Sequence, residues 1–584
     1  MQEHDLPKMS KKLSINQKSV TELLAVKDAD FVIPDYQRPY SWDEVECSTL
    51  WDDVYNFAIP DNDYSCFDES DEYFLGPIVV FKNRDGRFEV IDGQQRLTTL
   101  MLLLRAFYEA FGDSMRDENS LDTKREIAKC LWKADAFGRP ITPLQLKIDS
   151  EVATDNDKEE FIRILQDGKA PIELKSRYAT NYRFFQDRIH DFITATPSYF
   201  PYLPIRILCN CILLPIEAES QDTALRIFST LNDRGKPLSD SDIFKAHLYK
   251  AAAKRNAKDS FITQWKDLEN ICEKIFQPKT GVPTDEIFTR YMYYERAKKG
   301  SKDYSTVEAL RKFYEADGYR LLTDNYEQTF GNLLSLANFW LNVHNRNEKI
   351  FSRRILKKLF VLSHAPNGMW TYITSVYFMH NRDNNGLLDE ENFCAFLNKI
   401  TAFIWAYTIM KPGITSLRAP ILSETVSIVA GRDAAFSGYR FDKKELQNML
   451  NNFMFSGNRP ITRSMLVWWA FSNEHQELLP QGTRLEIEHI YAKNRSPVPE
   501  NIEALGNKSM LEKDINIRAS DYRFKDKANY YIGRVPGKKK TGIYELVDMA
   551  HRKDDFNDYD IRERTTAILT AFMAFIAENK LLRG

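Results

Sequence analysis

The join at residues 87 to 107, RFEVIDGQQRLTTLMLLLRAF, constrains the fold more than any other stretch. An apolar strand ends at Ile91, and Leu97 begins the core face of an apolar helix. The preceding YFLGPIVVF segment predicts a second strand, and Asp85-Gly86 between the two strands favours a hairpin turn. A hairpin followed by a long apolar helix is consistent with an N-terminal α/β domain.

The corner of this join, Asp92 to Arg96, contains an acid, two amides and an arginine, which a tight turn alone does not require. It lies at a helix N-terminus, where backbone N–H groups and the helix dipole favour an anion. Gly93 allows close approach of a ligand, Arg96 suits phosphate oxygens, and Thr98 adds a hydroxyl. Asp92 suits a metal ion or a ribose hydroxyl. We predict a nucleotide-phosphate pocket here, and the alternative is an ordinary turn with a surface arginine.

The rest of the first 250 residues mixes strand and helix patterns. FVIPDYQRPYSW is extended, because its prolines block a helix. Ser41 and Glu44 have the spacing of a capping box, which predicts a helix start. Its expected buried stripe is Val45, Leu50, Trp51, Val54 and Phe57. CNCILLPIEA predicts another buried strand, and a later helix is expected to be capped by Ser239 or Asp240.

The remaining chain divides into two regions with different patterns. Residues 251–470 are rich in aromatic and aliphatic residues at helical spacing, which predicts a helical scaffold domain. Its aromatic residues either line a pocket for a flipped base or, more simply, form the core. Residues 471–584 begin with a β–β–α pattern. The predicted fold class is therefore α+β and multidomain, predominantly helical, with domains at 1–250, 251–470 and 471–584.

Composition limits the number of domains, the possible binding surfaces and the expected location of the protein. With 584 residues, several domains are expected. The net charge of −3 means that any nucleic-acid surface must be local. The seven cysteines form no Cys-x-x-Cys pair, which is typical of reduced thiols in a cytoplasm. The N-terminus lacks a signal-peptide pattern and the apolar runs are too short for a bilayer, so we expect a cytoplasmic protein without a membrane partner.

Four segments resemble a known domain. IPDYQRPYSWD, FLGPIVV, VIDGQQRLTTL and FSTLNDRGKPLSDSDIFKAHL occur in this order and are similar to the N-terminal domain of GmrSD-type (type IV) restriction enzymes. That domain has a ParB/sulfiredoxin-like fold. The resemblance implies binding or hydrolysis of a nucleoside triphosphate, with ATP, GTP and CTP unresolved. The residues implied are Gln37, Arg38, Asp92, Gly93, Gln94, Gln95, Arg96 and Thr98. Asn232, Arg234 and Gly235 match the last motif, and a structural role in closing the sheet is an open alternative for them.

A second constellation follows in residues 484–527. The strand LEIEH ends at His489, Asn507 lies in the turn before a return strand, and Asn516 lies in a helix start. This order resembles the ββα-metal (HNH) nuclease finger. The resemblance implies His489 as general base, Asn507 as the residue that braces the hairpin, and Glu488 and Asn516 as ligands of Mg²⁺ or Mn²⁺.

The tail ASDYRFKDK also fits that finger, and makes Lys527 a candidate phosphate contact. From position 493 to position 540 the chain has twelve Lys/Arg and six Asp/Glu, a local balance of +6. Three points depart from the family pattern. No proline follows the His-Ile pair, Lys508 and Ser509 replace apolar residues, and strand alternation puts Glu488 and His489 on opposite faces. Glu486 is a weaker candidate ligand.

Together these patterns predict a nucleotide-regulated, metal-dependent DNA endonuclease of an anti-phage defence system. Its expected partner is modified phage DNA, and either a homodimer or partner defence proteins would be compatible with the sequence. Two alternatives stay open. One is a ParB-like nucleotide switch with a degenerate finger that acts through partner proteins. The other is a toxin-like nuclease that acts on RNA or host DNA.

Overall fold

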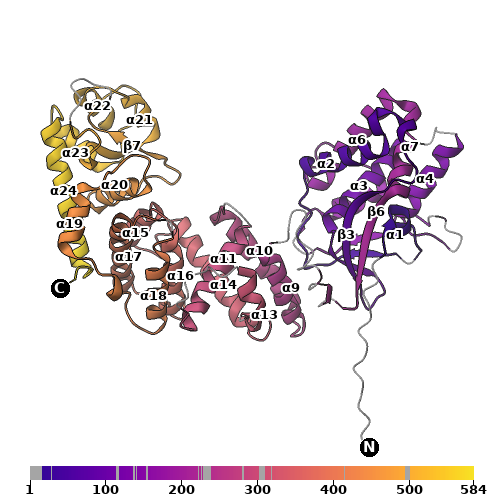
Figure 1. The fold of residues 1–584 in the computed structure, drawn as a ribbon, viewed down its shortest axis with the longest axis horizontal. Coiled ribbons are helices and arrows are strands. Elements are labelled where there is room, and N and C mark those ends of the chain that lie inside the picture. Colours follow the sequence, from indigo (N-terminus) through magenta and orange to yellow (C-terminus); the bar gives the residue numbers. More distant parts are fainter. Residues whose placement is uncertain are drawn as a thin grey trace, which may run out of the picture. The chain divides into compact units, whose positions relative to one another are not determined.

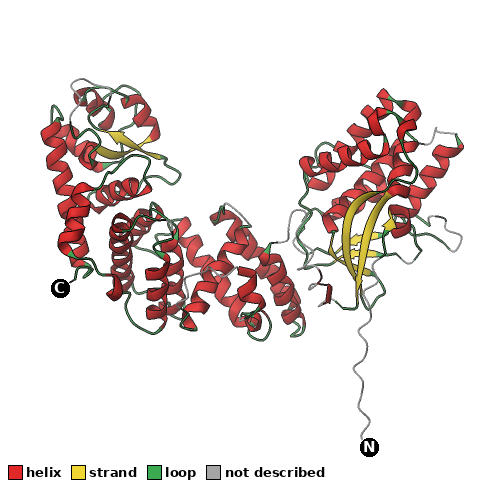
Figure 2. Cartoon of the chain, in the orientation of Figure 1, coloured by secondary structure: helices red, strands yellow, loops and turns green. Residues whose placement is uncertain are grey.

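The computed structural model describes most of the chain and divides it into two compact units, Met1–Lys266 and Asp267–Gly584. The described residues are 16–27, 29–112, 117–135, 139, 141–152, 155–220, 223–224, 227, 239–278, 282–301, 310–316, 318–413, 415–493 and 500–583. Helices dominate the described residues, as predicted, and a mixed sheet lies in the first unit (Figure 1, Figure 2).

The first unit contains a six-stranded sheet in the order β1-β6-β3-β4-β2-β5. The strands are β1 (Lys18–Ser19), β2 (Phe31–Ile33), β3 (Tyr73–Lys82), β4 (Phe88–Asp92), β5 (Ile148–Ser150) and β6 (Cys211–Ala218). β3 pairs with β4 in antiparallel register and with β6 in parallel register, so the predicted hairpin is confirmed at the sheet centre. Gly86 in its turn has a φ of 80°, the left-handed conformation that the Asp-Gly pair favours.

Helices pack over this sheet (Figure 1). They are α1 (Val20–Leu24), α2 (Glu44–Ala58), α3 (Gln94–Ala110), α4 (Glu118–Leu131), α5 (Lys158–Asp167), α6 (Arg177–Ala195) and α7 (Tyr202–Asn210), with short 3₁₀ turns at Pro60–Asn62, Tyr64–Cys66 and Pro197–Tyr199. The unit also contains α9 (Asp240–Ala253). α3 contacts α4, α5 and α6, and its residues from Leu97 to Leu104 are buried. The predicted core helix is therefore the centre of the helical layer.

The start of α2 differs from the prediction. Asp43, not Ser41, caps this helix, with Glu46 completing the capping box. Ser41 is unavailable because its backbone N–H and hydroxyl both donate to Gln95. Val45 was expected in the buried stripe. It is the second residue of α2, and its side chain is 73% exposed. By contrast, the capping of α9 by Ser239 is confirmed.

The second unit is helical up to its C-terminal part. α10 (Lys258–Ile275) crosses the boundary between the units, and α11 (Pro283–Lys298), α12 (Leu310–Glu315), α13 (Tyr319–Leu322), α14 (Tyr326–His344), α15 (Arg353–Ser363), α16 (Met369–Asn381), α17 (Glu390–Met410), α18 (Arg418–Val429), a 3₁₀ turn (Ser437–Tyr439), α19 (Lys443–Asn452) and α20 (Pro460–Ser472) follow. α17 is long and apolar enough to cross a membrane, but its most apolar stretch is 72% buried within the protein. It contacts α15, α19 and α20, so it acts as a core helix.

The C-terminal part of this unit is a hairpin surrounded by helices. Its elements are β7 (Leu485–His489), η5 (Leu505–Asn507), β8 (Lys508–Glu512), α21 (Lys513–Ala519), α22 (Phe524–Tyr531), α23 (Tyr544–Arg552) and α24 (Asp558–Glu578). β7 and β8 are antiparallel, with His489 opposite Lys508, and α21 contacts both strands. The predicted strand, return strand and helix start are all confirmed as secondary structure.

Candidate functional site

The Asp92 corner places an open helix end beside the sheet. Gly93 follows β4 with a φ of 86° and is the N-cap of α3. Its N–H donates to the Asp92 carboxylate over 2.7 Å, and no side chain caps the helix. A Cβ at Gly93 would lie only 3.0 Å from a side-chain carbon of Ile78, so glycine also allows the close approach of β3. The uncapped first turn of α3 is the kind of position that receives an anion.

The three glutamines of the motifs are buried and bind the protein itself. Gln37 donates to the Ile91 carbonyl over 3.0 Å, and Gln94 donates to Gln37 over 3.1 Å. Gln95 accepts from the Ser41 N–H at 2.7 Å, and its own amide donates to the Pro39 carbonyl at 3.2 Å. These amides fasten the extended segment onto the corner. That they also bind a nucleotide stays a prediction.

The charged residues of the corner form a small, mainly basic group. The Arg96 guanidinium lies over Gly76, where a Cβ would come within 2.8 Å, and donates to the Pro77 carbonyl over 3.0 Å. Burial raises the pKa of Asp92, and the positive charges of Arg96 and Arg38 act in the opposite direction. Burial lowers the pKa of Arg96, against the attraction of Asp92. Two guanidinium groups beside an uncapped helix end fit the phosphates of a nucleoside triphosphate. Thr98, in the same turn, is buried and only 2% exposed.

A buried polar network that the sequence did not predict supports this corner. The Tyr40 hydroxyl lies 2.7 Å from the Thr99 hydroxyl and accepts a hydrogen bond of 2.9 Å from Asn181 of α6. Asn181 also donates to the Trp42 carbonyl at 3.0 Å. Asn181 is far from the motif in sequence, so no local pattern could identify it. The predicted residues Asn232, Arg234 and Gly235 lie outside the described residues.

In the C-terminal hairpin, Asn507 joins the two sides of the loop. Its side-chain oxygen accepts from the Tyr491 N–H at 2.7 Å, and its amide donates to the Tyr491 carbonyl at 3.0 Å and to the Ile502 carbonyl at 2.9 Å. Asn507 is fully buried. The residue therefore fixes the backbone immediately after His489, which is the geometry that a bracing residue needs.

Glu488 and Lys527 form a buried ion pair on one face of β7. Lys527 donates to the Glu488 carboxylate at 2.7 Å, and Tyr531 donates to the same oxygen at 2.7 Å. Lys527 also donates to the His489 carbonyl at 2.6 Å. Burial raises the pKa of Glu488, although Lys527 and Tyr531 stabilise its charged form. The Lys527 side chain is 1% exposed, so in this structure its ammonium group is paired inside the protein with Glu488. Its contact with phosphate stays a prediction.

The His489 imidazole lies in a basic surrounding. Its Nε2 atom lies 3.9 Å from Glu503, has no hydrogen-bond partner among the described residues and is shielded from solvent. Burial, followed by the charges of Lys493 and Lys508, lowers the pKa of His489 to about 4, while Glu503 acts in the opposite direction. The ring is therefore neutral near pH 7, and in this arrangement it is a weaker base than an ordinary histidine.

The remaining candidate ligand, Asn516, lies with Glu486. Its amide donates to the Glu486 carboxylate at 3.2 Å, and no described hydrogen bond links it to Glu488. Within the described part of the chain, no three His, Cys, Asp or Glu side chains gather as a metal site. Because Glu488 is held by an ammonium group and Glu503 is paired with Lys493 and Lys508, the residues as arranged do not fit a divalent cation.

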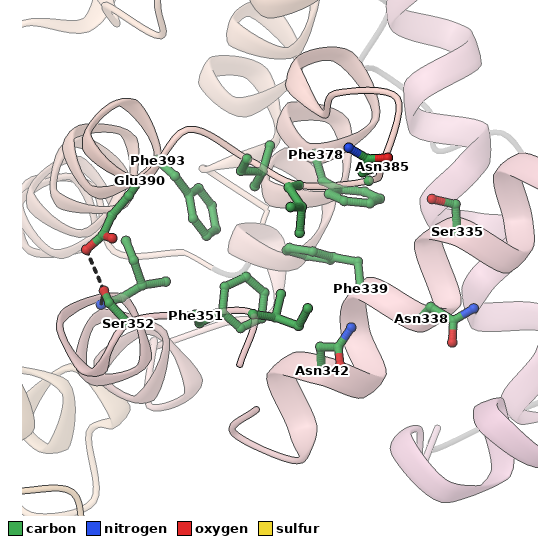
Figure 3. Close-up of a pocket in the computed structure, with 15 residues that line it drawn as sticks. Ser335, Asn338, Phe339, Asn342, Phe351, Ser352, Phe378, Asn385, Glu390 and Phe393 are labelled. Atoms are coloured by element: carbon green, nitrogen blue, oxygen red, sulfur yellow. Dashed lines mark hydrogen bonds between the residues drawn. The ribbon is translucent and has the colours of Figure 1, made fainter. Parts of the chain in front are cut away.

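The second unit also contains a cavity of about 280 Å³ that is lined by α14, α16 and α17, with Glu390 as its charged lining residue. Figure 3 shows Phe339, Phe351, Phe378 and Phe393 around it, with Asn338, Asn342 and Asn385 toward one side. The Phe339 and Phe378 rings are stacked, with centroids 4.3 Å apart. No lysine or arginine lines this cavity. The aromatic residues are thus mainly core, and the cavity lacks the cations that would bind phosphate.

The first unit is a mixed α/β domain with a polar strand-to-helix corner. Residues 20–249 match the family model for the N-terminal domain of GmrSD restriction endonuclease. This match supports the GmrSD restriction endonuclease family for the first unit and includes the Asp92 corner. The hairpin around His489 lies outside the matched residues. No curated protein matches the chain.

Proposed function

We propose that this protein is a DNA endonuclease of a restriction system that defends against phage. The observation that carries the proposal is the match of residues 20–249 to the N-terminal domain of GmrSD restriction endonuclease. Its substrate is foreign, modified DNA, and its setting is the cytoplasm. It works alone, as a homodimer or with partner defence proteins.

The residue proposed to act on the phosphodiester bond is His489. As a neutral imidazole it takes a proton from the attacking water. Asn507 keeps the backbone after His489 in place through its three hydrogen bonds. A divalent cation, Mg²⁺ or Mn²⁺, stays part of the proposal as an activator, but we derive no step from it because the carboxylates are occupied by lysines. Lys493 and Lys508 supply positive charge near the imidazole.

The Asp92 corner is proposed to bind a nucleoside triphosphate that regulates cleavage. The phosphates would lie against the first turn of α3, with Arg38 and Arg96 as their cations. Regulation suits a nuclease of this kind, because constant activity would damage host DNA. Whether the domain also hydrolyses the nucleotide belongs to the same proposal.

One observation favours a second candidate, a nucleotide switch whose finger no longer cuts DNA. Lys527 holds Glu488, and Asn516 lies with Glu486 instead. This candidate predicts nucleotide binding or turnover without any metal-dependent nicking.

Plasmid cleavage tests these candidates. Modified and unmodified DNA would be incubated with the full chain, with Mg²⁺ or with chelator, and with or without each nucleoside triphosphate. His489→Ala is expected to abolish cleavage, whereas His551→Ala, at an exposed histidine of α23, is the matched control. Arg96→Ala is expected to remove the effect of the nucleotide, and exposed Arg84→Ala is expected to preserve it.

Three outcomes contradict the proposal. Cleavage that survives His489→Ala would exclude this histidine as the base. A wild-type protein that binds nucleotide but never nicks DNA would favour the switch instead. Cleavage of unmodified host DNA or RNA alone would point to a toxin.

A further inference from the structure

A basic groove of about 500 Å³ lies along α15 in the second unit. Helices α15, α17 and α20 form its walls, and Phe575 of α24 also lines it. No motif in the sequence of this helical region indicates chemistry. The groove is lined by cations, small polar groups and aromatic rings, which are components of a nucleic-acid surface. Glu474 and Glu477 also line it, so four cations stand against two carboxylates.

The cations come from the first turns of α15, whose sequence starts Arg-Arg-Ile-Leu-Lys-Lys. Arg353, Arg354, Lys357 and Lys358 all line the groove. The helical spacing of one, four and five residues brings the four side chains to one side. A helix with such a row of cations on one face is suited to follow a chain of phosphates.

The two lysines are held by neutral oxygens. Lys358 donates to the Asn398 side chain over 2.7 Å, and Lys357 donates to the carbonyls of Asn473 and Glu474 at 3.3 and 3.4 Å. In the part of the chain that the structure describes, neither ammonium forms a salt bridge with a carboxylate. A buried or half-buried cation without a counter-ion favours the binding of an anion.

The arginines differ from the lysines. Arg354 forms a two-pronged pair with Glu391, with distances of 2.6 and 2.9 Å. Arg353 makes only long contacts of 3.6 and 3.7 Å with Glu348 and Glu477, and its side chain is 68% exposed. Arg353 is therefore free to turn toward a ligand, whereas Arg354 is already neutralised.

The neighbouring cations also affect Lys358. Burial lowers its pKa most, Cys394 acts in the opposite direction, and the charges of Arg354 and Lys357 add to the lowering. A bound phosphate would relieve this repulsion, because it would add negative charge among the three cations.

The floor of the groove is apolar. Trp468, Phe471 and Phe575 line it, next to the side chains of Thr401 and Ser472. The Trp468 and Phe575 rings contact each other, with centroids 5.4 Å apart. Aromatic rings beside a basic row are suited to the sugars and bases of a strand. The cavity of Figure 3 has the rings but no cations, whereas the α15 groove combines both features.

We propose that the α15 groove binds the phosphodiester backbone of a DNA strand, with phosphates on Arg353, Lys357 and Lys358. This inference rests on the proposed function in one respect, because it takes DNA as the substrate. It moves the DNA contact away from the basic run at 493–540, in which Lys508 and Lys527 are buried.

The test measures how DNA binding depends on salt. A fluorescein-labelled single strand and its duplex would be titrated with the full chain at several salt concentrations. For the double variant Arg353→Gln/Lys357→Gln, we expect binding about tenfold weaker or more, and a salt slope smaller by roughly 2. Lys349→Gln removes a nearby exposed cation that does not line the groove, and is expected to change neither quantity.

Each outcome separates the two proposals. If the wild type cleaves DNA and the double variant binds as tightly as Lys349→Gln, the groove proposal is overturned and the nuclease proposal stands. If the wild type binds but never cleaves, while the double variant loses binding, the nuclease proposal fails and the groove proposal stands. If the double variant Arg353→Gln/Lys357→Gln loses binding of a labelled nucleoside triphosphate but binds DNA normally, the groove is a nucleotide site and the groove proposal is overturned.

Discussion

Removing Lys527 is expected to destabilise the C-terminal hairpin strongly. In Lys527→Met, the Glu488 carboxylate loses its only described cation and keeps only the Tyr531 hydroxyl as a side-chain donor. Both partners are nearly fully buried, with side-chain exposures of 1% and 5%. Breaking such a pair from one side costs about 3–5 kcal/mol. The equilibrium population of the opened hairpin is therefore expected to increase by roughly two to three and a half orders of magnitude.

Hydrogen exchange read by mass spectrometry provides the assay, because it reports each region of the full chain separately. Peptides from β7 and β8 are expected to exchange faster in the variant, while peptides from α3 in the first unit are unchanged. The effect depends on pH. The folded-state pKa of Glu488 is raised above its ordinary value of 4.5 and rises further without Lys527. The difference from wild type is therefore smallest below the ordinary value and grows as the pH rises toward neutrality.

A surface pair on the same strand is the matched control. Lys513 lies 3.5 Å from Glu486, and their side chains are 45% and 37% exposed. Lys513→Met is expected to cost less than about 1 kcal/mol. The double variant Glu488→Gln/Lys527→Met is expected to recover much of the loss, since it removes the buried charge. Equal exchange in Lys527→Met and Lys513→Met would refute the buried ion pair as a stabilising element.

The remaining predictions concern the two sites. Gln95→Ala leaves the half-buried Ser41 N–H without its acceptor, and is expected to cost about 1 kcal/mol locally, read from exchange at residues 40–42. Gly76→Ala is expected to displace the Arg96 guanidinium and weaken nucleotide binding in a filter assay, whereas unchanged affinity would remove Arg96 from the site. Because its folded pKa is about 4, His489 is expected to contribute stability that is present above pH 6.5 and lost between pH 6.5 and 4. NMR titration of the imidazole measures this directly, and a transition near 6.5 would contradict it.

The long, regular elements of the fold were predictable, because each has a strong local pattern. The β3–β4 hairpin, α3, β6 and the β7–β8 hairpin all follow from hydrophobic alternation, turn residues or capping. Strands β1 and β5 were missed. They have two and three residues, and only pairing with β6 and β2 defines them. No local pattern of that length distinguishes a strand from a loop.

At the candidate sites, the sequence could place residues on a strand but could not choose their partners. Alternation put Glu488 and His489 on opposite faces, and their contacts agree: Glu488 binds Lys527 and Tyr531, while His489 lies near Glu503. Which cation would reach Glu488 depends on how α22 packs, and a motif does not contain that information. The same limit explains why the glutamines of the Asp92 corner were expected to bind a ligand, although tertiary contacts occupy their amides.

Charge counting along the sequence shows this limit most clearly. The +6 balance at residues 493–540 predicted a DNA footprint, yet Lys508 and Lys527 within it are buried and bound to carbonyls and carboxylates. The four cations of α15 are not conspicuous in the sequence, because Glu390 and Glu391 follow two helices later, at the start of α17, and the region is close to neutral on average. In the folded protein these cations differ in their partners. Arg354 pairs with Glu391, while Lys357 and Lys358 donate hydrogen bonds to neutral oxygens. A phosphate responds to the charge that stays uncompensated at a surface, so burial and pairing, not the local count, determine where a strand of DNA is held.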